Sequence, residues 1–79
     1  MKQLFEIGDL VRRTPRGQKM VVNFVYTPYC EGIYLAAYQC FKMQHPSADY
    51  FYTCISMRTG KTINGIFPED VLEKVIHKK

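Results

Sequence analysis

The sequence predicts an all-β fold, a small barrel of five to six antiparallel strands with one helical turn before the last strand. Segments rich in β-branched and aromatic residues recur along the 79-residue chain, as is typical of strands. Glycine and proline separate these segments and predict tight turns. Residues 64–75 then have the pattern of a strand, a turn and a short returning strand, with which a small barrel closes.

The alternation of apolar residues places the individual strands. Strands are predicted over residues 10–13, 20–26, 33–43, 50–58, 61–67 and 72–76. Pro15 and Gly17 predict a turn after the first strand, because proline presets φ and glycine tolerates positive φ. In the fourth strand Phe51, Ile55 and Met57 would face the core, with the tyrosines on the other face. The predicted core comprises Val11, Met20, Val22, Phe24, Leu35, Phe51, Ile55, Ile63, Phe67 and Val75.

Residues 33–43 fit two structures. Apolar residues occur on both parities, as in a long bent strand that serves both ends of a barrel. Ala36 and Ala37 favour a helix, whereas aromatic residues such as Tyr34 and Tyr38 favour a strand. We predict a strand and keep the helix as the alternative.

The pattern around Pro68 predicts how the chain turns back. Ile63, Gly65 and Phe67 share one parity and would face one side of a strand, which Pro68 should end because it lacks a ladder donor. A proline followed by two acidic residues suits one helical turn, since proline tolerates the first helical position and acids favour the positive helix end. Residues 72–76 then have the apolar content of a short last strand.

Two motifs resemble Src-homology-3 (SH3-like) barrels. Residues 65–75 are similar to the family's glycine, two apolar residues, proline, turn and returning strand, and residues 4–11 to its opening turn with Gly8-Asp9. The resemblance implies an SH3-like barrel. Signalling members have a tyrosine in the closing turn, where this chain has Val71, and a tryptophan beside the groove for proline-rich peptides. This chain has no tryptophan, so the resemblance supports the barrel and argues against proline-rich ligands.

A second resemblance is to the YodC-like family of short bacterial proteins, whose function is unknown. Its pattern is echoed by Gly8-Asp9-Leu10-Val11, Gly17, Met20-Val21-Val22 and Cys40. The family's aromatic residue after that cysteine is displaced, because Phe41 stands where a one-residue gap would place Lys42. This resemblance implies no particular activity.

At this length we expect a single domain over residues 1–79, with 76–79 as a frayed tail. No apolar run is long enough to span a membrane and no signal-peptide core is present, so we expect a cytoplasmic protein without a membrane partner. The three cysteines are too far apart in the sequence to form the closely spaced pairs of zinc or redox sites: Cys30, Cys40 and Cys54. We expect buried thiols in a reducing compartment, and neither metal nor cofactor.

The net charge of +4 favours anionic partners mildly. Nucleic-acid binding would place four cations of the N-terminal part at phosphates: Arg12, Arg13, Arg16 and Lys19. Exposed tyrosines would then stack on bases: Tyr29, Tyr50 and Tyr52. In the competing interpretation the tyrosines fill the core and the basic residues solvate strand edges.

Nothing in the sequence indicates catalysis. Nucleophilic catalysis would need an oriented histidine. His77 lies in the predicted tail, and the loop position of His45 favours an ordinary solvated side chain over a general base. Turn capping explains the adjacent carboxylates of Glu69 and Asp70. Loops 27–32 and 44–49 flank long strands, where they would frame a shallow groove. We therefore expect a non-enzymatic interaction module with a protein partner, and nucleic acid as the alternative. An unpaired edge strand would also allow two copies to pair, so the oligomeric state stays open.

Overall fold

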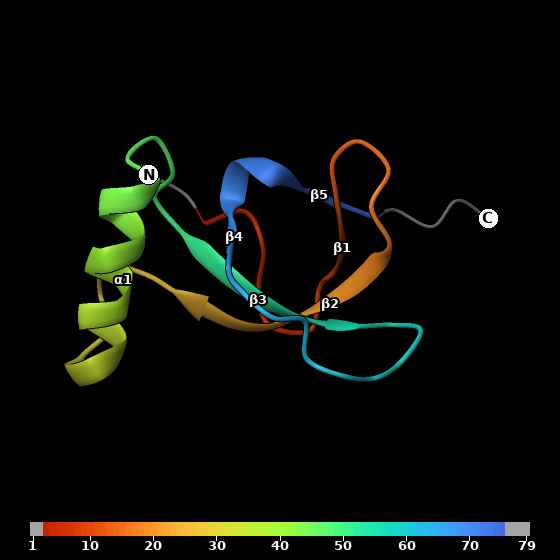
Figure 1. Cartoon of the computed structure of the whole chain (residues 1–79), viewed down its shortest axis with the longest axis horizontal. Coiled ribbons are helices and arrows are strands. Elements are labelled where there is room, and N and C mark those ends of the chain that lie inside the picture. The colour runs from red at the N-terminus through yellow and green to blue at the C-terminus, as the bar shows by residue number, and fades with distance from the viewer. Residues whose placement is uncertain (1–2, 76–79) are drawn as a thin grey trace.

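The computed structural model describes residues 3–75, which form five strands, one α-helix and a short 3-10 helix (Figure 1). The elements are β1 (Leu10–Arg13), β2 (Lys19–Tyr26), α1 (Gly32–Gln44), β3 (Phe51–Ser56), β4 (Phe67–Pro68), η1 (Glu69–Val71) and β5 (Leu72–Lys74). All strands pair antiparallel in one sheet. The mostly β architecture and the helical turn before the last strand are therefore confirmed.

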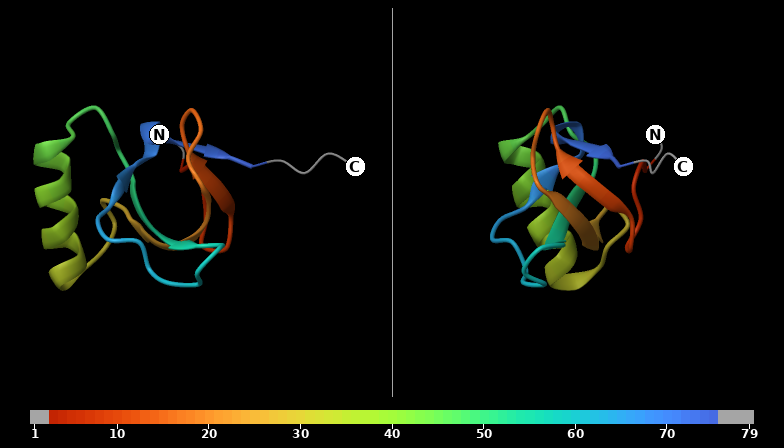
Figure 2. Two further views of the ribbon diagram at one scale, coloured as in Figure 1. Left: turned by 45° about the vertical axis from the view of Figure 1, so that its right-hand side comes forward. Right: turned by 90° about the vertical axis from the view of Figure 1, so that its right-hand side faces the viewer.

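The sheet is strongly bent. Its strand order is β4-β3-β2-β1-β5, so the two edge strands are consecutive in the chain and η1 joins them. Figure 2 shows the strands curving around a common interior. Within residues 3–75 no strand pairing connects β4 with β5, and the sheet is open there. The first and last strands of the chain, β1 and β5, are neighbours in this sheet. Just beyond β5, Val75 N donates to Leu10 O at 2.9 Å.

The segment predicted as a long strand is the helix α1. Leu35, Tyr38 and Phe41 recur every three residues on one side and pack on the sheet. Much of the remaining helix is alanine, glutamine, lysine and methionine, which are good helix formers. The apolar residues on both parities thus reflect helical rather than strand periodicity. The strand prediction was wrong because aromatic strand preference depends on packing context.

Two apolar clusters use opposite faces of β3. The main core contains Phe5, Val11, Met20, Val22, Tyr50, Tyr52, Cys54 and Leu72. The helix-side cluster contains Tyr38, Ala48 and Phe51, with Tyr26, Leu35, Phe41 and Ile66 packed on it. The predicted orientation of β3 is therefore wrong, because its tyrosine side faces the main core and Met57 is exposed.

The predicted core is otherwise recovered in part. Four of its residues are buried: Val11, Met20, Val22 and Phe51. The others are half-buried: Phe24, Leu35, Ile55, Ile63, Phe67 and Val75.

Gly17 is required for space. A Cβ added there would lie 2.6 Å from the Cβ of Arg13 and 2.8 Å from its carbonyl oxygen. Its φ is not positive. The turn after β1 thus needs glycine because the chain approaches itself closely, and not for the positive φ that the sequence predicted.

Among residues 3–75 no helix has both the length and the apolar character needed to cross a bilayer. The predicted frayed tail, residues 76–79, lies outside the described residues, and so does His77.

Candidate functional site

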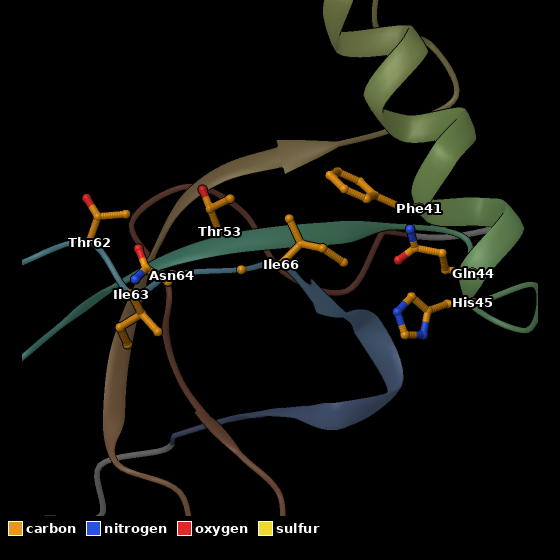
Figure 3. A pocket seen from close by; sticks show the side chains of 9 residues that line it. Phe41, Gln44, His45, Thr53, Thr62, Ile63, Asn64 and Ile66 are labelled. Carbon is orange, nitrogen blue, oxygen red and sulfur yellow. The ribbon is translucent and has the colours of Figure 1, made fainter.

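Two adjoining hollows lie between the C-terminal end of α1 and the segment that leads into β4. Their volumes are about 560 Å³ and about 510 Å³, within the range of small-ligand sites. They share four lining residues: His45, Ile63, Asn64 and Ile66. Figure 3 shows the first hollow, where side chains from the end of α1 face those of residues 62–66. We call the two hollows together the α1–β4 groove.

Hydrogen bonds hold the helix end that forms one wall of the groove. Lys42 Nζ donates to the carbonyl oxygens of Pro46 and Ala48 at 2.9 and 2.8 Å. It also donates to the carboxylate of Asp49 at 3.1 Å. The ammonium group therefore ties the following loop back to the helix, which fixes the last helical residue, Gln44, at the groove.

The opposite wall is an interruption in the pairing along β3. Ile63 N donates to Cys54 O at 2.9 Å, and regular pairing resumes only at β4. Residues 64–66 therefore stand opposite a single residue of β3 and form a bulge. Gly65 has a φ of 92°, which glycine adopts without strain. The predicted continuous strand over 61–67 is wrong for this reason.

The lining of the first hollow combines apolar surface with amide groups. Phe41, Ile63 and Ile66 provide the apolar part. Gln44 and Asn64 each provide an amide that can both donate and accept hydrogen bonds. An extended peptide presents alternating side chains and backbone donors and acceptors. The hollow therefore offers apolar contact and hydrogen-bonding groups side by side.

The second hollow adds charged groups. Arg13 and Asp70 belong to its lining. Arg13 also lines a third hollow of about 220 Å³, together with Gln18 and Met20. The groove thus continues from the helix end toward the β1–β2 turn. Its second hollow has one cationic and one acidic side chain, so a ligand group of either charge would meet an opposite charge there.

The four predicted phosphate-binding residues lie together on the β1–β2 hairpin. All are exposed: Arg12, Arg13, Arg16 and Lys19. Arg12 Nε is 2.5 Å from a carboxylate oxygen of Glu73 on β5, an exposed ion pair of the kind that adds about 0–1 kcal/mol. Arg13 faces the groove. The structure therefore gathers the predicted cations, but two of them already contact or line other features.

The three tyrosines predicted as stacking platforms are not brought together. Tyr29 is 84% exposed in the loop between β2 and α1. Tyr50 and Tyr52 are buried in the main core, so the prediction that they are exposed platforms is wrong. The eight-residue β2 separates Tyr29 from the basic hairpin, by roughly 26 Å for a strand of that length. The exposed ring and the cations therefore lie at different ends of the molecule.

Tyr52 has a structural role instead. Its hydroxyl donates to the carboxylate of Glu69 at 2.5 Å, and the same carboxylate oxygen accepts from Leu4 N at 2.9 Å. Burial, and then the hydrogen bond to Glu69, raise the pKa of Tyr52 above its ordinary value of 10.0. These contacts tie the segment before β1 to η1.

The three cysteines differ in environment. Cys54 is buried, and burial raises the pKa of its thiol to about 11, which makes it unreactive near neutral pH. Cys30 is half-buried and Cys40 is exposed on α1, so the prediction of three buried thiols holds only for Cys54. In the described range no group of three His, Cys, Asp or Glu side chains could hold a metal ion.

No protein-family model matches the chain, and neither does any curated protein or solved structure. The groove is therefore interpreted from its own residues. Loop 44–49 was predicted to frame a groove, and His45 of this loop does line it. Loop 27–32 lies away from the lining. Asn64-Gly65 was a missed signal, because this dipeptide marks turns rather than strand interiors.

Proposed function

We propose that this protein is a non-enzymatic interaction module that binds a short extended segment of a protein partner in the α1–β4 groove. The observation that carries the proposal is the apolar surface of Ile66 between the amides of Gln44 and Asn64, with Ile63 beside Asn64. We also propose an SH3-like barrel, supported by the bent antiparallel sheet and by η1 before β5. A cytoplasmic location completes the proposal, and the exposed free thiol of Cys40 is compatible with a reducing compartment.

The first hollow should bind by shape and hydrogen bonding rather than by charge. Apart from His45, its described lining contains no acidic or basic side chain. Binding there should therefore respond little to salt. Backbone groups of the ligand would pair with the two amides, and its apolar side chains would contact the isoleucines.

Nucleic-acid binding is the second candidate. The exposed cations of the β1–β2 hairpin favour it, among them Arg16 and Lys19. A base-stacking ring at the same end would strengthen single-strand binding, but Tyr29 lies at the other end of β2. The hairpin would thus bind phosphate alone, with a strong dependence on salt.

A selection from random peptides displayed on phage, with the whole protein immobilised, tests the groove directly. The affinity of a selected peptide should fall about 10-fold in the double variant Gln44→Ala/Asn64→Ala, which removes two hydrogen-bonding groups. The matched control Arg16→Ala/Lys19→Ala should bind like the wild type. Failure to select any peptide, or equal binding by the groove variant, would contradict the proposal.

Salt separates the two candidates. Between 50 and 200 mM salt, a single-stranded oligonucleotide held by four phosphate contacts should lose about 50-fold in affinity. A groove-bound peptide should change by less than about 3-fold. Nuclease treatment of a lysate capture provides a further check, since proteins bound through the groove should persist. Their loss after nuclease, together with a steep salt dependence, would favour the hairpin.

A further inference from the structure

The outer face of α1 is apolar although it is exposed. Four exposed residues form a stripe along it, which we call the α1 seam: Ile33, Ala36, Cys40 and Met43. Ile33 is 78% and Met43 84% exposed. At 3.6 residues per turn the seam lies opposite the buried Tyr38. A helix that is apolar on both sides is normally covered on both.

The seam is open to approach. Figure 2 shows α1 at one end of the molecule, with the described strands on its inner side alone. The contacts of the helix-side cluster hold that inner side to the sheet. The outer side is therefore available to a second surface without any change in the fold.

We propose that the α1 seam is the contact surface of a homodimer, in which two copies of α1 pack antiparallel about a twofold axis. The 3-4-3 spacing of the seam is that of a coiled-coil contact. It is also symmetric about position 38. An antiparallel copy therefore places Ile33 opposite Met43, and Ala36 opposite Cys40.

The sizes of the paired side chains fit this arrangement. The two small residues, Ala36 and Cys40, meet near the axis and allow the helices to approach closely. The two large residues, Ile33 and Met43, meet at the ends and fill the space where the helices diverge. Because each copy offers the same patch, the contact closes on itself, as an isologous dimer requires.

Charge also permits a second copy. The chain as a whole carries +4, which disfavours contact between identical surfaces. The seam, however, has no charged side chain. The one charged residue within α1 is Lys42, whose ammonium is held by the loop that follows the helix. Two copies therefore meet on a neutral strip.

The size of the seam sets the expected strength of the dimer. The seam has four residues per copy, far fewer than the roughly 20–30 residues a side of a standard stable interface. A standard stable interface buries about 800 Å² per partner. The dimer should therefore be weak, and the fraction of chains in dimers should rise with protein concentration. It is independent of the proposed peptide groove, which uses other side chains.

Sedimentation equilibrium of the full chain, from low micromolar to millimolar concentration, tests the proposal. The average mass should rise from one chain toward two. Ala36→Glu should weaken association by at least about 10-fold, because it buries a carboxylate in the apolar contact. Gln39→Glu is the matched control, with the same charge change on the same exposed helix but outside the seam, and it should dimerise like the wild type.

A second variant and a cross-link keep the test decisive. If circular dichroism shows that Ala36→Glu does not fold, Met43→Glu at the exposed end of the seam replaces it. A short bismaleimide should link two chains through Cys40, and Cys40→Ser should abolish that product. A monomer at every concentration, dimers unaffected by the seam variants, or cross-links that map elsewhere would each overturn the proposal.

Discussion

The main core and the helix-side cluster lie on opposite faces of β3 and are held in different ways. The main core draws buried side chains from four strands and from Phe5 and Tyr50 outside them, so its contacts join distant parts of the chain. The helix-side cluster comes almost wholly from residues 26–51, with Ile66 added. It has three buried members, Tyr38, Ala48 and Phe51. We therefore expect α1 to open at a lower free energy than the sheet.

The difference teaches where binding surfaces arise in this molecule. The first hollow of the groove and the seam both lie on the helix side, where one short helix is covered on a single face. The strands at the other end bury their side chains in a common interior. Surface is thus left for partners where local packing is incomplete.

Phe51→Ala should give the largest effect, because Phe51 is wholly buried and joins α1 to the sheet. A loss of about 3–5 kcal/mol in the free energy of unfolding is expected. Urea denaturation measures it, and hydrogen exchange should show α1 losing protection before β1 and β2.

Val22→Ala, in the main core, is the control and should affect both regions alike. If both variants lower protection equally everywhere, the two clusters are one cooperative unit. Phe51→Leu serves if the alanine variant does not fold.

Gly17→Ala should sharpen the comparison from the strand side. Its Cβ would meet the Arg13 backbone, which cannot move without disturbing β1, so a loss of about 1–3 kcal/mol is expected. Gly60→Ala is the control, since its φ of 72° causes strain but no atom lies within 4 Å. It should cost about 1 kcal/mol. Thermal or urea unfolding compares the two, and equal losses would mean that the turn relaxes freely.

Alkaline pH should weaken the main core specifically. Burial raises the pKa of the Cys54 thiol from 9.0 to about 11, so the unfolded chain releases this proton first. Stability is therefore complete below pH 9 and falls as pH rises from 9 to 11. The loss should be about 1–3 kcal/mol, because each unit of pKa shift corresponds to about 1.4 kcal/mol. Tyr52, whose pKa is also raised by burial, adds to the loss above pH 10.

Urea denaturation across this pH range measures the effect. Cys54→Ala should flatten the pH dependence between 9 and 11. Cys40→Ala is the matched control, because it makes the same substitution at an exposed cysteine on α1. A slope that is the same in both variants would show that Cys54 does not hold its proton in the folded state.

Tyr38→Phe should have the smallest effect and should be confined to the helix side. It removes the hydrogen bond from the Tyr38 hydroxyl to the carbonyl oxygen of Asp49, which is 2.9 Å long. A loss of about 0.5–1.5 kcal/mol is expected. Hydrogen exchange should accelerate in α1 and remain unchanged in the sheet. Tyr34→Phe, the same change at a half-exposed position of the same helix, should stay within about 0.5 kcal/mol of the wild type.

The regular strands and the final turn could be predicted from sequence. The predicted bounds of β1 are those of the structure, and β2 begins one residue earlier than predicted. Both segments combine strand-forming residues with clear flanking turns. The order of Pro68, Glu69 and Asp70 encodes η1 locally, because fixed φ and acids at a helix start act within one turn.

The helix and the orientation of β3 could not be predicted in the same way. Both faces of β3 are buried at its start, so Phe51 and Tyr52 both find a core and alternation does not distinguish them. Helix α1 likewise has apolar residues all round, which hides its buried side. Only the three-dimensional contacts show which side of α1 packs on the sheet and which core each face of β3 enters.

The candidate site was predictable only in outline. Loop 44–49 was correctly placed beside a groove, but Gln44 and Asn64 lie far apart in sequence and have no motif in common. The four predicted cations lie on one hairpin, β1–β2. The pairing of Arg12 with Glu73 depends on β1 lying beside β5, which charge patterning alone does not reveal.

The pairing of β1 with β5 also bears on how the chain folds during synthesis. Residues 10–13 can form a ladder with β2 early, but their second edge waits for residues 72–74. On the ribosome, Val11 would therefore stay incompletely covered until that last strand has left the exit tunnel. Nascent chains halted before residue 72 should accordingly remain sensitive to protease, and chaperones would find the apolar interior accessible throughout that interval.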